Sequence, residues 1–502
     1  MFACCRALAV LLLMTLPWGC AEASQPTWSQ QGLTDLSYQL TPVLVDRRLK
    51  ALDVHMDVAV PPSGVVKIKP PQGIGQDEPS DKVIIDTVRF GRITVTSKKW
   101  WLVRANRGQH RVQIDYRINP ATGADSVGGA GYKDVLMGND WFQALGENLF
   151  AAPMGYTDLP AKLRWQGPPD WSFVSPLENP EKAGPVTLKN LLQTTAAAGA
   201  KVQQVSRSIR GGTLTVVGVG YWALPLDKFA DVAASVISAQ RAFWKDTNGP
   251  YFVTVVAMNR DDDFNAGVGR DGAFAAYVAR EADMSNIRKL ITHEYTHMWI
   301  PTRTGRMPDG NEEPLAYWFS EGFTVFRTSH AMLQSGAWTI QDFANDFNSL
   351  STSYDMSPAR HIANRDVMAG FWRSNDVQAV PYQRGAILAW MLDARLRKQT
   401  GGQRDMHDVL LRMRDRSIEN PRQDVRTNLV RSYAEEGGGP IDDWLNRFID
   451  QGEQMVLPVD LFSGCLKMLE ENKAGIGRVQ SVMVEPGLSE RSAEACVDRL
   501  GR

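Results

Sequence analysis

The stretch ITHEYTHMWI, residues 291–300, decides how the rest of the sequence is interpreted, because it places two histidines four positions apart. On a helix, positions i and i+4 lie one above the other, so His293 and His297 can bind one metal ion together. Glu294 is offset by one position, where its carboxylate can accept a proton from metal-activated water. We therefore expect a helix over 286–300 that carries two ligands of a zinc site.

The ends of this helix are also indicated by the sequence. Ser285 is the expected N-terminal cap, and Pro301 prevents the helix from continuing. A pair of histidines at this spacing also occurs on ordinary helices without any metal, so the motif needs support from elsewhere in the chain.

A catalytic zinc ion needs a third protein ligand. In one peptidase class the motif HExxHxxGxxH supplies it, but Ile300 and Arg303 stand here where the glycine and the histidine would be. In another class a glutamate on a following helix completes the set. The run YWFSEGFTVF, residues 317–326, contains the single carboxylate of Glu321 among apolar residues, and such a group is costly to bury unless it is paired or binds a metal. The alternative is a glutamate favoured by the helix dipole, with Ser320 as the cap.

The pattern of hydrophobic residues changes near residue 222. Short alternating or β-branched runs predict strands before it, and Gly, Pro and Asn clusters separate them; the runs are 54–60, 82–90, 91–97, 110–118 and 213–219. Many short strands with frequent turns are typical of a β-sandwich. The fold class is therefore α+β and multidomain, with an N-terminal β-sandwich-like domain followed by a mainly helical domain.

Helical spacing dominates the second region. We expect a helix over 227–246 and a strand over 251–258. Beyond 285 the signals are nearly all helical, with helices expected at 286–300, 320–333, 340–350, 382–399, 406–416 and 441–451. The expected domains are a signal peptide over 1–23, the β-sandwich-like domain over 24–222, a catalytic domain over 223–455 and a C-terminal tail over 456–502.

Composition restricts the partners of this 502-residue chain. The formal net charge is -1 and no basic block is present, which argues against nucleic acid as a partner. The N-terminus has a basic residue, a short apolar run and the small-x-small site Ala21-Glu22-Ala23, which together predict a signal peptide cleaved near Ala23. The mature chain has no transmembrane segment, so we expect a secreted or periplasmic protein. Lipidation of Cys20 is the less favoured alternative, because Pro17 and Trp18 precede it.

Cysteine use agrees with export. Three of the five cysteines lie in the signal peptide, and only Cys465 and Cys496 remain in the mature chain. Such a pair in an oxidising compartment predicts one disulfide that staples the C-terminal tail, with two buried free thiols as the alternative.

The motifs resemble those of a known family. HEYTHMW, then WFSEGFT, then PYQRGAILAWMLDARLRKQTGG at 381–402 are similar to the glycyl aminopeptidases, gluzincin zinc metallopeptidases related to the aminopeptidase N group. The resemblance covers most of the mature chain, including the β-rich segments HRVQIDYRI and NLFAAPMGY. It implies a thermolysin-like catalytic domain behind a β-domain, one Zn2+ and hydrolysis of a peptide or protein substrate.

The resemblance also assigns roles to individual residues. His293, His297 and Glu321 match the metal ligands, and Glu294 matches the general base. Tyr382 matches the phenol that stabilises the oxyanion in the family, although an amphipathic residue at the start of a helix is its ordinary interpretation. No cofactor other than the metal is implied.

The chain departs from the family at the residue that holds the substrate's free amine. The family carries a glutamate on a strand shortly before the zinc helix, and the counterpart by position is Ala275 in Gly272-Ala273-Phe274-Ala275-Ala276. Glu281 is nearby at the wrong spacing. Aminopeptidase and endopeptidase activity therefore both stay open, and a noncatalytic metal-containing protein that binds peptides or another partner is the alternative function. Side-chain preference and oligomeric state do not follow from the sequence.

Overall fold

The computed structural model describes most of the chain outside its N-terminus. The described residues are 33, 35–73, 80–97, 99–120, 134–178, 186–220, 225–247, 249–258, 265–270, 272–308 and 310–501. The predicted signal peptide and Cys20 lie outside them.

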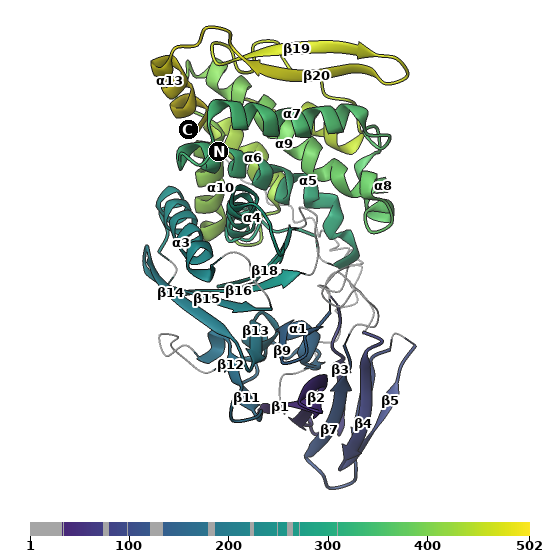
Figure 1. Cartoon of the computed structure of the whole chain (residues 1–502). Helices are drawn as coiled ribbons and strands as arrows, with labels where there is room; N and C mark the ends of the chain where they lie inside the picture. The colour runs from purple at the N-terminus through teal and green to yellow at the C-terminus, as the bar shows by residue number, and fades with distance from the viewer. Residues whose placement is uncertain are drawn as a thin grey trace, which may run out of the picture.

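Three small sheets form the N-terminal β-region at the bottom of Figure 1. The first has the order β11-β1-β2-β7-β4, formed by Ala161–Trp165, Leu36–Val45, Arg48–Ala59, Arg111–Ile118 and Val83–Arg89. The second has the order β10-β3-β6-β5, formed by Ala152–Pro153, Val65–Lys69, Trp101–Ala105 and Gly91–Val95. The third has the order β12-β13-β9-β8, formed by Ser172–Val174, Thr195–Gly199, Trp141–Leu145 and Leu136–Met137.

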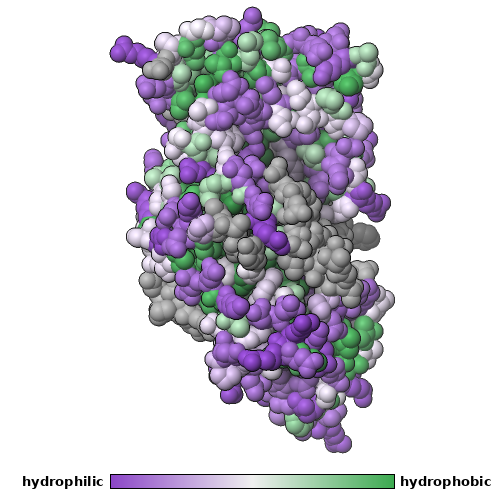
Figure 2. Space-filling view, in the orientation of Figure 1, coloured by the Kyte–Doolittle hydropathy of each residue, from purple (hydrophilic) through white to green (hydrophobic). Residues whose placement is uncertain are grey.

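Alternation along the strands explains why the first two sheets share one core. Val54, Met56 and Val58 on β2 are buried, while the residues between them are partly exposed. This period of two places one face of the sheet inside. The expected β-sandwich-like arrangement is confirmed. Figure 2 shows a mainly polar face with a small hydrophobic area beside β4 and β5.

A fourth sheet lies between the β-region and the helices (Figure 1). Its order is β14-β15-β16-β18-β17, formed by Gln203–Ile209, Gly212–Val219, Tyr251–Met258, Ala273–Ala279 and Asn265–Arg270. Strands β15, β16 and β18 are parallel, while β14 and β17 are antiparallel edge strands. The sheet thus begins at 203, on the N-terminal side of the boundary expected at 222, because β15 pairs with β16.

Helices cover the other side of this sheet, as the sequence predicts. They are α3 Leu226–Phe243, α4 Met284–Thr296, α5 Tyr317–Ser320, α6 Gly322–Gln334, α7 Ile340–Met356, α8 Asn364–Gly370, α9 Asn375–Gln399, α10 Met406–Glu419, α11 Val425–Glu435 and α12 Asp442–Trp444, which continues as π-helical turns over Leu445–Asp450. The short helices α1 Gly146–Leu149 and α2 Leu188–Leu192 belong to the β-region. Across the described part of the chain, no helix combines the length and hydrophobicity of a membrane span.

The C-terminal tail adds two strands to a region whose sequence signals are nearly all helical. Strands β19 Leu466–Lys473 and β20 Gly477–Val484 form a hairpin on top of α7. The amide nitrogen of Asn348 on α7 donates to the carbonyl of Val482 at 2.8 Å, and the Ser351 hydroxyl donates to the carbonyl of Gln480. The last helix, α13 Glu490–Gly501, is joined to the start of β19 by the disulfide Cys465–Cys496.

Candidate active site

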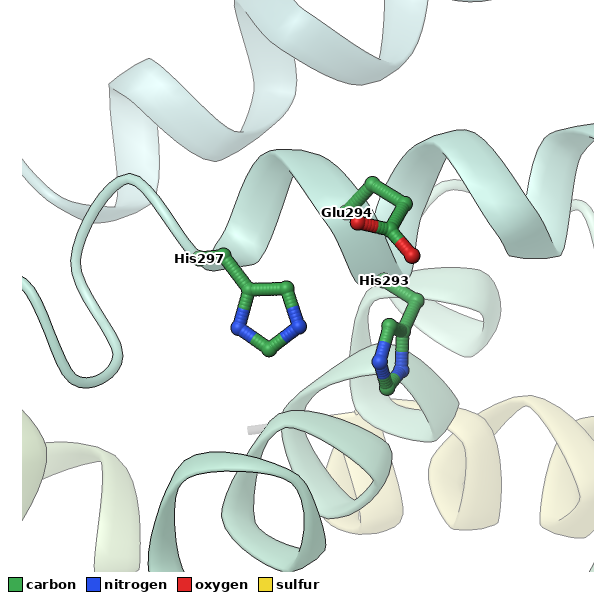
Figure 3. A group of neighbouring side chains, drawn as sticks. All are labelled: His293, Glu294 and His297. Atoms are coloured by element: carbon green, nitrogen blue, oxygen red, sulfur yellow. The ribbon is translucent and has the colours of Figure 1, made fainter. Parts of the chain in front are cut away.

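Helix α4 presents both imidazoles on one side. Figure 3 shows the rings of His293 and His297 below the helix and the carboxyl group of Glu294 beside them. The two ring centroids lie 4.9 Å apart. The N-terminal cap differs from the sequence prediction, because the carboxylate of Asp283 accepts a hydrogen bond from the backbone N–H of Ser285 at 3.1 Å. The helix ends at Thr296, so His297 occupies its C-terminal cap.

Glu321 completes a three-residue cluster with these histidines. Its Oε2 atom lies 3.3 Å from Nε2 of His293 and 3.5 Å from Nε2 of His297. Zinc binds nitrogen and oxygen ligands at about 2.0–2.2 Å, so two ligands of a tetrahedral ion are separated by roughly 3.3 Å. Both distances from Glu321 therefore fit ligands of one zinc ion, and the donor atoms of His293, Glu294 and His297 also lie within 4.8 Å of one another. Ser320 does not cap the following helix, since α6 begins after Glu321 without a side-chain cap.

Contacts on the rear of α4 fix the orientation of the ligands. Nδ1 of His297 lies 2.8 Å from the carbonyl oxygen of Ile300, which leaves Nε2 directed at the cluster. On the opposite face, Nε of Arg241 donates to the Tyr295 hydroxyl at 2.7 Å, and the Gln240 amide donates to the Thr296 hydroxyl at 2.8 Å. Both partners lie on α3, so α3 holds α4 in place.

The electrostatics of the two carboxylates differ. Burial raises the pKa of the Glu294 carboxyl, and the imidazoles of His297 and His293 oppose that rise. Burial also opposes ionisation of Glu321, but His297 and His293 beside it hold the pKa of its carboxyl well below the usual range. Glu321 is thus suited to remain an ionised ligand, while Glu294 is the more basic of the two groups, as a proton acceptor needs to be.

Tyr382 lies on α9, within the same cleft. Its ring is nearly parallel to that of His293, with centroids 6.4 Å apart. Burial and the negative charge of Glu321 raise the pKa of the phenol well above its ordinary value. The hydroxyl therefore remains protonated across the physiological range and can donate a hydrogen bond.

The cluster opens into a cleft of about 930 Å³ between α4, β17 and the turns around residues 301–321. The strand along this cleft is β17, not the segment around Ala275. Ala275 lies on β18, between β16 and β17, and is completely buried in the interior. Ala275, the counterpart by position of the family's amine-binding residue, is thus buried on β18, and residues of β17 line the cleft instead.

Charged residues of the described cleft lining are largely paired. Arg270 at the end of β17 forms an ion pair with Glu147 of α1, and Arg303 forms one with Asp246 after α3. The carboxylates among the described lining residues are those of Glu294, Glu313 and Glu321. None of them lies on β17, whose sequence is NAGVGR.

The sequence did not reveal the part that β17 takes in the site. Its residues Gly267 and Gly269 weaken any strand pattern, and no charged side chain marks the run before Arg270. The partners Arg241 and Asp246 were missed as well, because a buried ion pair or hydrogen bond between distant helices has no sequence signal. The available hint was the pair Gly267 and Gly269 at alternate positions, because glycine in a strand often marks a site where another group lies close to the backbone.

Comparison with known proteins agrees with this geometry. The model of the M61 glycyl aminopeptidase family matches residues 286–371, which contain the three clustered residues and Glu294. Among curated proteins, none matches the chain in sequence.

Solved structures with a similar fold come from two bacteria. An aminopeptidase N family protein from Idiomarina loihiensis superposes with a TM-score of 0.70 at 15% identity, over 87% of this chain and 79% of that protein. An M1 zinc metallopeptidase from Deinococcus radiodurans has a TM-score of 0.50 at 13% identity, over 86% and 96% of the two chains. A mutant of that enzyme bound to a Tyr-Ser-Ala substrate has a TM-score of 0.52 at 13% identity, over 85% and 96%.

Fold and site together define a metallopeptidase with the architecture of the aminopeptidase N group. The segment 286–371, which carries the motifs, is similar to the M61 glycyl aminopeptidase family.

Proposed function

We propose that the protein is an exported peptidase that holds one zinc ion between His293, His297 and Glu321. The observation that supports this most directly is that Oε2 of Glu321 lies 3.3 and 3.5 Å from Nε2 of His293 and His297, as two ligands of a single tetrahedral ion would. A bound zinc ion would supply Lewis acidity, which activates water and polarises a carbonyl group.

The remaining steps fall to residues of the chain. Glu294 accepts the proton of the attacking water and passes it to the leaving amine, a role that suits a buried carboxylate with a raised pKa. Tyr382 donates a hydrogen bond to the oxygen that becomes negative in the transition state. Its protonated phenol and its position facing His293 support this role.

We infer that substrates are peptides that need no free amine at their N-terminus. Within the described residues, the strand along the cleft carries no carboxylate, and Arg270 at its end is paired with Glu147. A substrate ammonium group would find no counterion on β17. Matched peptides with free and acetylated N-termini test this: comparable kcat/KM values support endopeptidase activity, and cleavage of the free peptide alone supports an aminopeptidase.

Metal content and one substitution test the catalytic proposal. Purified protein should contain one zinc per chain, and Glu294→Gln should retain that zinc while kcat falls by about 10²–10⁴-fold, the usual contribution of a general base. Protein without stoichiometric zinc, or a Glu294→Gln variant as active as the wild type, would contradict the proposal.

A noncatalytic peptide-binding protein is the second candidate. The lack of a carboxylate on β17 is the observation that favours it, since the strand along the described cleft carries no amine anchor. Peptide binding without turnover by zinc-loaded wild-type protein would select this candidate over a peptidase.

Export rests on the N-terminal sequence and agrees with the disulfide Cys465–Cys496. Expression of the full chain in a bacterial host should yield mature protein in the periplasm or medium that begins near Ser24. N-terminal sequencing of that fraction checks the cleavage site, and a lipid attached at Cys20 would instead tether the protein to membranes.

A further inference from the structure

Strand β17 approaches the side chain of Glu294 unusually closely at Gly267. A Cβ atom built on Gly267 would lie 2.6 Å from Cγ and 2.8 Å from Cδ of Glu294, and 2.4 Å from Cε2 of Phe274. All three distances are shorter than nonbonded carbon atoms tolerate, since their optimal separation is about 3.5–4.0 Å. Any residue other than glycine at this position must displace the Glu294 side chain.

The requirement for glycine here is one of space and not of backbone conformation. Gly267 is not among the glycines with positive φ, and it pairs with Ala276 in the regular ladder between β17 and β18. An L-amino acid could adopt this backbone without strain. The side chain of Glu294 and the buried ring of Phe274 leave no space for a side chain at position 267.

We propose that Gly267 is a positioning residue for the general base: it leaves room for the Glu294 side chain to lie against β17 with its carboxyl group beside the metal ligands. The proposal rests on the proposed catalytic role of Glu294. A carboxylate oxygen of Glu294 and one ring nitrogen each of His293 and His297 lie within 4.8 Å of one another, so a small displacement of the carboxyl group changes its relation to the reacting atoms.

The same strand provides a matched comparison. Gly269 is two residues further on and lies on the same face of β17. A Cβ atom on Gly269 would meet only the backbone oxygen of Glu294, at 3.9 Å, which is an ordinary contact. Gly269→Ala thus adds the same methyl group to the same cleft strand without displacing the general base.

The test is steady-state kinetics of zinc-loaded full-length protein. Because a misplacement of about 1 Å can cost about 100-fold in rate, Gly267→Ala should lower kcat by roughly 10–100-fold while KM and zinc content stay within about twofold of wild type. Any effect of Gly269→Ala should appear in KM instead of kcat. A merely structural role for Gly267 would not produce this division between kcat and KM.

The contact with Phe274 calls for a second variant, because a methyl group forced against a buried ring can destabilise the fold. In the double variant Gly267→Ala/Phe274→Leu the shorter side chain relieves that contact, so thermal stability should recover toward that of Phe274→Leu alone. The contact with Glu294 remains, and kcat should stay low. Recovery of kcat together with stability would overturn the proposal.

A double-mutant cycle separates this proposal from the proposed function. If Gly267 acts through Glu294, then Gly267→Ala should lower kcat in the wild-type background and have no further effect on the residual rate of Glu294→Gln. Equal effects of Gly267→Ala in both backgrounds would overturn the positioning role and leave the general base in place. An active Glu294→Gln variant would instead overturn the proposed function itself.

Discussion

The Oε2 atom of Glu321 lies 3.3 Å from Nε2 of His293, although the two residues are 28 positions apart in the sequence. The Glu321 carboxylate is buried here beside the imidazoles of His293 and His297. A divalent ion between the three groups would satisfy all of them at once, since a buried carboxylate needs a cation or hydrogen-bond donors. The site is therefore expected to depend on metal for stability as well as for activity.

Replacing this ligand should remove the metal. We expect Glu321→Ala to lose most of its zinc and all measurable hydrolysis, because only two protein ligands remain. Zinc at about 100 times its dissociation constant should stabilise wild-type protein by about 2.7 kcal/mol and should not stabilise Glu321→Ala. Elemental analysis and thermal unfolding with and without added zinc measure both effects. A variant that keeps one tightly bound zinc would contradict the assignment of this ligand.

Tyr382→Phe should retain zinc and lose rate. Removal of one oxyanion hydrogen-bond donor typically lowers kcat by about 10²–10³-fold, and the ring that faces His293 would remain. Tyr317→Phe is the matched control, because Tyr317 is another phenol of the same cleft. Its effect on kcat should be much smaller. If Tyr317→Phe lowered kcat more than Tyr382→Phe does, Tyr317 would be the oxyanion hydrogen-bond donor instead.

The sequence was sufficient for the parts of the site that follow helical periodicity. His293, His297 and Glu294 are neighbours on one helix, and the lone acid in YWFSEGFTVF indicated Glu321. The predicted strands and helices were found near their expected positions for the same reason: period two or period 3.6 marks an element whose one face is buried.

Features that depend on tertiary packing were beyond the sequence. Counting residues back from α4 pointed to Ala275. The chain forms two strands in this region, however, and β17 pairs with β18 as the edge strand of the sheet. Which of two consecutive strands becomes the edge depends on sheet order, which no local pattern encodes. The hairpin β19–β20 was missed because its outer residues are mostly exposed and polar, so it lacks the hydrophobic alternation of a buried strand.

Helices α5 and α9 touch through backbone atoms at Gly385, next to the residues of the site. A Cβ atom on Gly385 would lie 1.7 Å from the carbonyl oxygen of Trp318 and 2.9 Å from Cα of Gly322. We expect Gly385→Ala to lower the free energy of unfolding by about 3 kcal/mol, since rigid backbone cannot give way as a side chain can. Both helices carry or adjoin site residues, so activity should fall with stability.

The matched control for this contact is Gly370→Ala on α8. The atoms nearest to a Cβ atom on Gly370 would belong to the Val377 side chain, with its two methyl groups at 3.0 and 3.2 Å, and this side chain can shift. Urea unfolding of the two variants compares the contacts directly. If both variants lost an equally small amount of unfolding free energy, α5 and α9 could move apart with little loss of stability.

The disulfide Cys465–Cys496 should stabilise the protein without supporting catalysis. It closes a loop of 31 residues and joins α13 to the start of β19, while neither cysteine lines the cleft. Because such a bond mainly restricts the unfolded chain, replacing both cysteines with serine should lower the free energy of unfolding by about 2–4 kcal/mol. The kcat of the folded double variant should equal that of wild type. Urea unfolding of the oxidised protein, the reduced protein and the double variant provides the measurement: the last two should agree. A fall in kcat at temperatures where the double variant remains folded would show instead that the tail communicates with the cleft.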